Sequence, residues 1–169
     1  PKYADVTDVF DICSHPDSCK FADWYPHSEK SETKAYISWL KKQMRNSRQN
    51  GYTWFVEQKE KQKVIATISV VEWDHSGNIA TVGYTLSHEY QHKGYATEML
   101  LAVLRYLFFS ESAVRVQAKV MLENAPSIRL LERVGMQKEG LLRRGASCKT
   151  ECVDVYLYAL LKEEFLKPR

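Results

Sequence analysis

The stretch GYTLSHEYQHKGYATEMLLAVLRYLFF, residues 83–109, decides the fold that the sequence predicts. It begins as the end of a strand, passes through the short polar loop QHKGYA at 91–96, and continues as an amphipathic helix. Apolar residues recur in that helix with helical rather than strand spacing, at Ala96, Leu100, Leu104, Leu107 and Phe108. Because the first turn of a helix carries N–H groups without intrahelical partners and the helix dipole favours negative charge there, the junction predicts an anion site.

The side chains of the loop suit a phosphate. Gly94 has no Cβ to hold a ligand away from the backbone, Ala96 is nearly as small, and Thr97 adds a hydroxyl donor. Lys93 supplies a positive charge. An ordinary turn from loop to helix, in which Gly94 only relieves strain, explains the same residues, and the loop by itself leaves both interpretations open.

Composition indicates one soluble domain over residues 1–169. The chain has 169 residues, of which 44% are hydrophobic and 27% charged, which is typical of a globular protein. No segment approaches the roughly 20 apolar residues that span a bilayer, so no membrane partner and a cytoplasmic location are expected. The net charge of +3 is too small to indicate nucleic-acid binding. The cysteines, which lack metal-like spacing, predict reduced thiols and no metal site; they are Cys13, Cys19, Cys148 and Cys152.

The rest of the chain alternates helices and strands. A short helix is expected over 5–12, and a second helix begins at Ser28 or Ser31 and ends at the turn signal Gln49–Asn50–Gly51. Between them, aromatic residues at 21–26 either line a substrate mouth or cover the core edge. Strands over 53–58, 64–74 and 79–87 are expected to form an antiparallel meander. After the helix described above, a strand is expected over 114–121, a helix over 127–134, and a final pair of strands over 136–145 and 151–161. The residues after 161 are expected to trail off. This order predicts a mixed α/β sheet with helices on its faces.

With this order, the chain resembles the GNAT superfamily of acyl-CoA-dependent N-acetyltransferases over nearly its whole length. Residues 91–96 fit that family's Q/R-x-x-G-x-G/A signature, and Gly83–Tyr84 precede them. A second block is similar to the ribosomal-protein N-acetyltransferases of the RimJ/RimL type, through Asn124, Ser127, Glu132, Gly135, Met136, Glu139 and Gly140. The resemblance implies a mixed, mostly antiparallel sheet with helices on both faces, splayed between parallel central strands at 79–86 and 114–121. The resemblance also implies a first strand that would come before Pro1.

The resemblance also implies how acetyl-CoA, the expected co-substrate, is bound. The backbone at Tyr84, Thr85 and Leu86 would pair with the pantetheine and polarise the thioester carbonyl. Asn124 and Ser127 would approach the pantetheine arm and the sulfur. The pyrophosphate would lie on the loop and the first helical turn, which are Gln91, His92, Lys93, Gly94, Tyr95, Ala96 and Thr97.

Catalysis on this scaffold needs few groups. The resemblance implies Ser127, with Asn124, as the catalytic pair, Ser127 being the acid toward the sulfur. Leu131 stands where many other superfamily members carry a tyrosine acid. Ser127 as a helix cap is the alternative.

The general base is less evident. Relatives often carry a glutamate where this chain has Thr81, and a threonine cannot accept a proton at neutral pH. Deprotonation of the amine would fall to a water relay or to a neighbouring group among Glu72, Asp74, His88 and Glu89.

Three functions follow as hypotheses. The first is acetyl transfer from acetyl-CoA to a primary amine, most simply the N-terminal amine of a protein or peptide, by direct attack in a ternary complex. The second is a small-molecule amine or drug acetyltransferase, and the third is a CoA-binding regulatory module without turnover. A homodimer is compatible with each of them. The shape of the cleft around Trp24–His27 and the 144–151 turn should separate a peptide acceptor from a metabolite.

Overall fold

A computed structural model of the chain describes residues 1–45 and 51–167, and Gln49–Asn50 of the predicted turn fall outside the described residues. The first part is helical, with a 3-10 turn η1 (Tyr3–Asp5), α1 (Val6–Ser14), the short α2 (Pro16–Cys19) and α3 (Lys30–Arg45). Three strands and a second 3-10 turn follow, namely β1 (Tyr52–Gln58), β2 (Lys63–Asp74), β3 (Ile79–Leu86) and η2 (His88–Tyr90). The remainder is α5 (Tyr95–Phe109), β4 (Arg115–Met121), α6 (Ala125–Arg133), β5 (Gln137–Cys148), β6 (Glu151–Leu161) and α7 (Lys162–Phe165).

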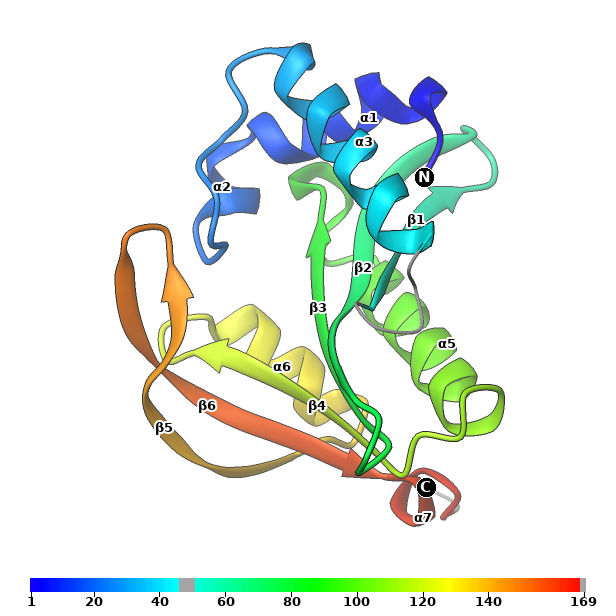
Figure 1. Cartoon of the computed structure of the whole chain (residues 1–169), viewed down its shortest axis with the longest axis vertical. Coiled ribbons are helices and arrows are strands. Elements are labelled where there is room, and N and C mark those ends of the chain that lie inside the picture. The colour runs from blue at the N-terminus through cyan, green and yellow to red at the C-terminus, as the bar shows by residue number, and fades with distance from the viewer. Residues whose placement is uncertain (46–50, 168–169) are drawn as a thin grey trace.

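The described strands form one six-stranded sheet in the order β1-β2-β3-β4-β6-β5 (Figure 1). All neighbouring pairs are antiparallel except β3 and β4, which are parallel. The predicted fold class, including the meander and the parallel central pair, is therefore confirmed.

The two central strands separate after a short contact. In the described chain, β3 and β4 pair only where Ile79–Thr81 lie beside Arg115–Gln117. Beyond this point β3 stays with β2 and β4 stays with β6, so the sheet opens between them, as Figure 1 shows. At the last paired position Gln117 Nε2 donates to Thr81 Oγ1 at 3.1 Å, which ties the strands together where they begin to diverge.

A β-bulge in β2 alters which side chains face the opening. Val70 of β2 pairs with Val82 of β3, and the next pair along the two strands is Glu72 with Thr81. Val71 is therefore an extra residue in β2. Directly paired residues in an antiparallel sheet project from the same face. The bulge therefore places Glu72 on the face of Thr81.

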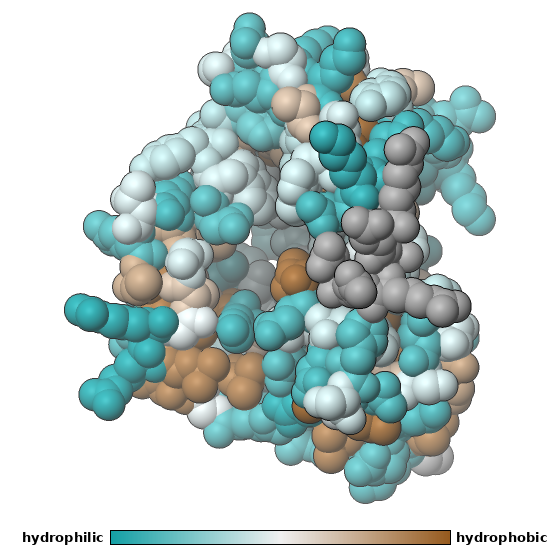
Figure 2. All heavy atoms as spheres, in the orientation of Figure 1, coloured by the Kyte–Doolittle hydropathy of each residue, from teal (hydrophilic) through white to brown (hydrophobic). Residues whose placement is uncertain are grey.

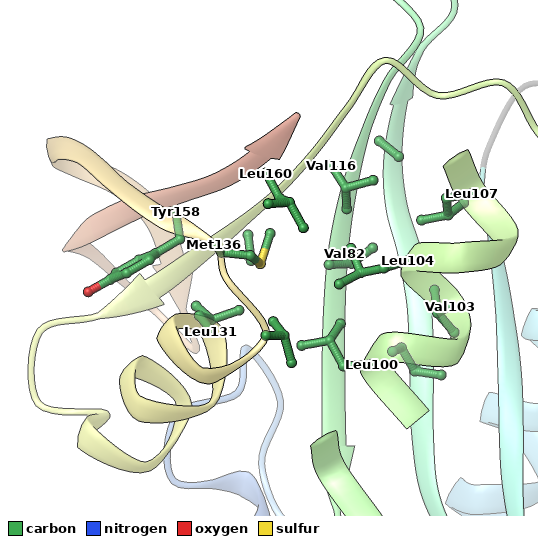
Figure 3. Packing of buried hydrophobic residues seen from close by; sticks show 14 of the residues in the cluster. Val82, Leu100, Val103, Leu104, Leu107, Val116, Leu131, Met136, Tyr158 and Leu160 are labelled. Atoms are coloured by element: carbon green, nitrogen blue, oxygen red, sulfur yellow. The ribbon is translucent and has the colours of Figure 1, made fainter. Parts of the chain in front are cut away.

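Helices cover both faces of the sheet. Adjacent strand residues point to opposite sides, and Val64 packs in a cluster with Val9 of α1 and Ile37 of α3, whereas Ile65 packs in one with Met99 of α5. The largest cluster lies where α5 and α6 meet the sheet (Figure 3) and includes Val82, Leu100, Leu104, Val116, Leu131, Met136 and Leu160. This cluster holds α5, and thus the loop before it, against the central strands.

Two features differ from the sequence-based expectation. The final hairpin is longer, because β5 continues to Cys148 through an irregular register between Leu142 and Ala146. Residues 162–165, expected to trail off, form α7, where Glu164 accepts a hydrogen bond from the backbone N–H of Leu161 at 2.9 Å.

Candidate active site

A large cleft occupies the opening between β3 and β4. Its volume is 1590 Å³, above the roughly 300–1,000 Å³ of ordinary small-molecule pockets, and Figure 2 shows the surface hollowed at this place. Residues from the α1–α3 segment, β2, β3, the 91–97 loop, α6 and the β5–β6 hairpin line it. A cleft of this size has room for a long cofactor and for a second substrate.

The loop before α5 opens its backbone toward the cleft. Gly94 has φ +85° and His92 has φ +61°, so the chain turns sharply twice within three residues. Glu98 N donates to Gly94 O at 3.1 Å as the first helical bond. The N–H groups of residues 95–97 consequently have no intrahelical acceptor. This open helix end is the local geometry on which the predicted anion site depends.

Most of the predicted phosphate residues line the cleft, with Lys93 as the exception. Gln91, His92 and residues 94–97 belong to the lining. The Lys93 ammonium instead donates to the Glu89 carbonyl at 2.8 Å and lies 5.4 Å from the centre of the Tyr90 ring. The structure therefore brings backbone dipoles, rather than the Lys93 charge, to the predicted anion site.

The β3 backbone offers a free edge. Tyr84, Thr85 and Leu86 line the cleft, and their other edge pairs with β2. In the described chain no strand lies beside them on the β4 side. Because unpaired backbone groups seek partners, this edge can bind an extended amide-bearing chain.

Ser127 lies opposite this edge at the start of α6. Asn124 is the N-cap, since its Oδ1 accepts from the Ser127 backbone N–H at 3.2 Å. The alternative that Ser127 is the cap is therefore wrong, and its side chain instead lies close enough to the Tyr84 phenol to affect the phenol's pKa. Burial raises the pKa of Tyr84 to about 12, against the smaller lowering effect of the nearby Ser127 side chain. Tyr84 is thus a neutral phenol at pH 7, beside a serine hydroxyl inside the cleft.

The structure separates the four candidates for the base. Glu72 and His88 line the cleft. Asp74 instead stabilises the turn after β2, where its Oδ1 accepts from the Ser76 and Gly77 backbone N–H groups at 2.9 and 3.2 Å. Glu89 is exposed and outside the lining, and His88 lies past the end of β3 in η2.

Aromatic side chains enclose the end of the cleft under α3. Phe21 and Trp24 from the predicted mouth contribute, together with Tyr36 and Trp39, which the sequence analysis missed. The i, i+3 spacing of Tyr36 and Trp39 on one helix was the available signal. His27 also lines this end, where burial lowers its pKa and its Nδ1 contacts Thr33 Oγ1 at 2.8 Å.

The β5–β6 hairpin touches the α2–α3 connection across one side of the cleft. Cys148 Sγ donates to the Ala22 carbonyl at 3.4 Å. Beside it, Lys149 Nζ lies 5.4 Å from the centre of the Tyr25 ring. Figure 1 shows the hairpin tip rising toward this connection. We call these two contacts the hairpin bridge.

Comparison with known proteins identifies the family. A family model described as an acetyltransferase (GNAT) domain matches residues 1–137. The uncharacterized N-acetyltransferase p20 of Bacillus licheniformis is 34% identical over 152 residues, which cover 90% of this chain and 84% of that protein. The chain therefore belongs to the GNAT family, and its predicted class, an acetyl-CoA-dependent N-acetyltransferase, is confirmed.

Solved structures share the fold. Mycobacterium smegmatis RimJ, in complex with CoA-disulfide, superposes with a TM-score of 0.83 at 22% identity, covering 99% of this chain and 82% of that chain. The microcin C7 self-immunity acetyltransferase MccE, in complex with acetyl-CoA and AMP, superposes with a TM-score of 0.85 at 20% identity, covering 95% and 89%. At these identities the likeness concerns the fold. Among residues 1–45 and 51–167, no helix is long and apolar enough to cross a bilayer.

Proposed function

We propose that this protein transfers the acetyl group of acetyl-CoA to the primary amine of a peptide or protein N-terminus. The observation that carries the proposal is the convergence, in one cleft, of an unpaired β3 edge, a helix N-terminus and the Ser127–Tyr84 hydroxyl pair. The first two features suit the pantetheine and the phosphates of the co-substrate, and the third suits its sulfur.

Different residues of the cleft bind the co-substrate and transfer protons. Tyr84–Leu86 hold the pantetheine by their backbone and polarise the thioester carbonyl, while the N–H groups of 95–97 bind the pyrophosphate. The acceptor amine forms the new C–N bond as the C–S bond breaks. The amine loses its proton to the base, Ser127 gives a proton to the departing thiolate and regains one from solvent, and the Tyr84 phenol orients the Ser127 hydroxyl. Because a thiol is a good leaving group with a pKa near 8.5, this acid contributes modestly.

Ser127→Ala is expected to lower kcat by roughly 10–100-fold, which is at or below the usual contribution of a general acid because the thiolate leaves easily, with KM for acetyl-CoA nearly unchanged. Steady-state thiol release with an N-terminal peptide panel measures it. Ser147→Ala, at an exposed serine that also lines the cleft, is the matched control and should keep the parent kcat. Equal kcat values for the two variants would remove Ser127 from the mechanism.

Glu72 is the base that this proposal assigns. The β2 bulge places it directly opposite Thr81 and on the same face, so its carboxylate faces the cleft from the neighbouring strand. The side chain is exposed and can therefore reach the amine directly or through one water. Glu72 of β2 would thus provide the carboxylate that relatives often carry at the position of Thr81 in β3.

Glu72→Gln is expected to lower kcat/KM roughly tenfold near neutral pH, because only about a tenth of an α-amine with a pKa of about 7.7–8.0 is then neutral. The defect should shrink above about pH 8, because an α-amine with a pKa of about 7.7–8.0 then arrives already neutral and needs no base. Glu89→Gln, which changes a carboxylate outside the cleft lining, is the control. A defect of Glu72→Gln that stays constant from pH 6.5 to 9.5 would indicate a structural role instead.

The hairpin bridge supports an acceptor that enters by its end. The contacts of Cys148 with Ala22 and of Lys149 with Tyr25 close one side of the cleft, which obstructs a chain lying across it but admits a terminus. The aromatic enclosure by Trp24, Tyr36 and Trp39 favours a small amine as the second candidate. Rates with N-terminal peptides, the same peptides with a blocked N-terminus and one lysine, and small aryl and alkyl amines distinguish these acceptors.

A further inference from the structure

Three side chains with metal-binding groups meet outside the proposed catalytic centre. His15 lies between α1 and α2, Asp17 is in α2, and His88 is in η2. One donor atom from each residue lies within 4.8 Å of the other two. In Figure 1, α2 lies beside the upper end of β3, the strand that leads into η2.

The distances are close to those of a metal site. The Asp17 carboxylate oxygen is 3.5 Å from His88 Nδ1 and 4.0 Å from His15 Nδ1. Ligands at roughly 2.0–2.2 Å from a tetrahedral Zn²⁺ lie roughly 3.4 Å apart. The separations between the donors must therefore shorten by roughly 0.1 to 1.4 Å. The two imidazole rings, which are stacked with their centroids 4.8 Å apart, must turn to allow this.

The cluster can make this adjustment. The side chains of Asp17 and His88 are 60% and 52% exposed, and that of His15 is 43% exposed. The His15 ring nitrogen that faces Asp17 accepts the Asp17 N–H at 3.3 Å as the N-cap of the short helix α2, and this long hydrogen bond breaks when the nitrogen binds an ion. Exposed rings rotate at little cost, and water can fill the fourth position.

We propose that His15, Asp17 and His88 bind a divalent transition-metal ion, with Zn²⁺ as the best match. Two imidazoles and one carboxylate are a donor set that Zn²⁺ favours, whereas Mg²⁺ and Ca²⁺ prefer oxygen ligands alone. The ion joins α2 to η2, which directly precedes the 91–97 loop. Because Asp17 and His88 also line the rim of the cleft, the metal stiffens the mouth through which ligands enter. The expectation of no metal site rested on the spacing of the cysteines with one another and with histidines along the sequence, whereas the fold brings this set together from distant segments.

Calorimetric titration of the tag-free protein with Zn²⁺ tests the proposal. A Cys152→Ser background removes an exposed thiol that could bind the ion elsewhere. One equivalent is expected, with affinity reduced at least tenfold in His15→Ala and in His88→Ala. His75→Ala, which removes an exposed histidine outside the cluster, should bind as the parent does.

Thermal unfolding with and without Zn²⁺ provides a second measurement. Binding to the folded state raises Tm, so Zn²⁺ should raise the Tm of the chelator-treated parent by a few degrees and leave that of His88→Ala unchanged. Mg²⁺ should have no effect on either. The proposal fails if His88→Ala or His15→Ala retains the parent's Zn²⁺ affinity, or if His75→Ala loses it. Neither measurement involves turnover, so the outcome is independent of the proposed acetyl transfer.

Discussion

Gly94→Glu should abolish acetyl-CoA binding. The substitution places a carboxylate at the N-terminus of α5, where the cleft would hold phosphate. Two unit charges about 4 Å apart repel by about 4 kcal/mol at an effective dielectric constant near 20, which corresponds to a roughly 1,000-fold loss of affinity. Calorimetry with acetyl-CoA measures the effect, and the loss should lessen in high salt because surface charges are screened.

Two further variants separate charge from strain and bulk. A Cβ at Gly94 would meet no described atom within 4 Å, although φ is +85°. Gly94→Ala therefore carries only the strain of the left-handed conformation, roughly 1–2 kcal/mol, and should bind at most about 30-fold more weakly. Gly94→Gln adds bulk without charge, and its affinity for acetyl-CoA should lie between those of Gly94→Ala and Gly94→Glu. If Gly94→Glu bound acetyl-CoA as well as Gly94→Ala, the phosphate would have to lie elsewhere.

The parts of the fold that depend on local sequence were predictable. The 91–97 loop and α5 follow from glycine, helix periodicity and the chemistry of a helix end, which are properties of neighbouring residues. The strand order and the splay came from the resemblance to a family. The residues placed by local rules, such as Gly94 and Thr97, accordingly lie in the cleft.

The parts that depend on register, on loop conformation or on long-range contacts were not predictable. Glu72 faces the cleft only because Val71 is an extra residue in β2, and an alternating pattern does not reveal a bulge. Lys93 turns away because it finds the Glu89 carbonyl and the Tyr90 ring. His15 and His88 meet only after α2 packs beside η2. In each case the position of the side chain depends on a contact that the spacing of residue types along the sequence does not predict.

Gly51→Ala should strongly destabilise the fold. Gly51 is buried with φ +76°, and an added Cβ would lie 2.0 Å from the Val70 carbonyl oxygen. The backbone must shift to relieve this contact, in addition to the strain of about 1–2 kcal/mol for a left-handed alanine. The free energy of unfolding is therefore expected to fall by about 3 kcal/mol or more, which lowers Tm by roughly 6–12 °C in a domain of this size.

Gly94→Ala is the matched control for this variant, because both glycines have positive φ but only Gly51 lies against backbone. Denaturant unfolding of the two variants isolates the steric effect, and equal midpoints would mean that the Gly51–Val70 contact is not close in solution. Val70 adjoins the bulge that orients Glu72. A backbone shift at Val70 should therefore also lower kcat/KM under conditions in which Gly51→Ala remains folded, with the same alkaline recovery expected for Glu72→Gln. If Gly51→Ala were destabilised but fully active, the position of Glu72 would not depend on the geometry of the bulge.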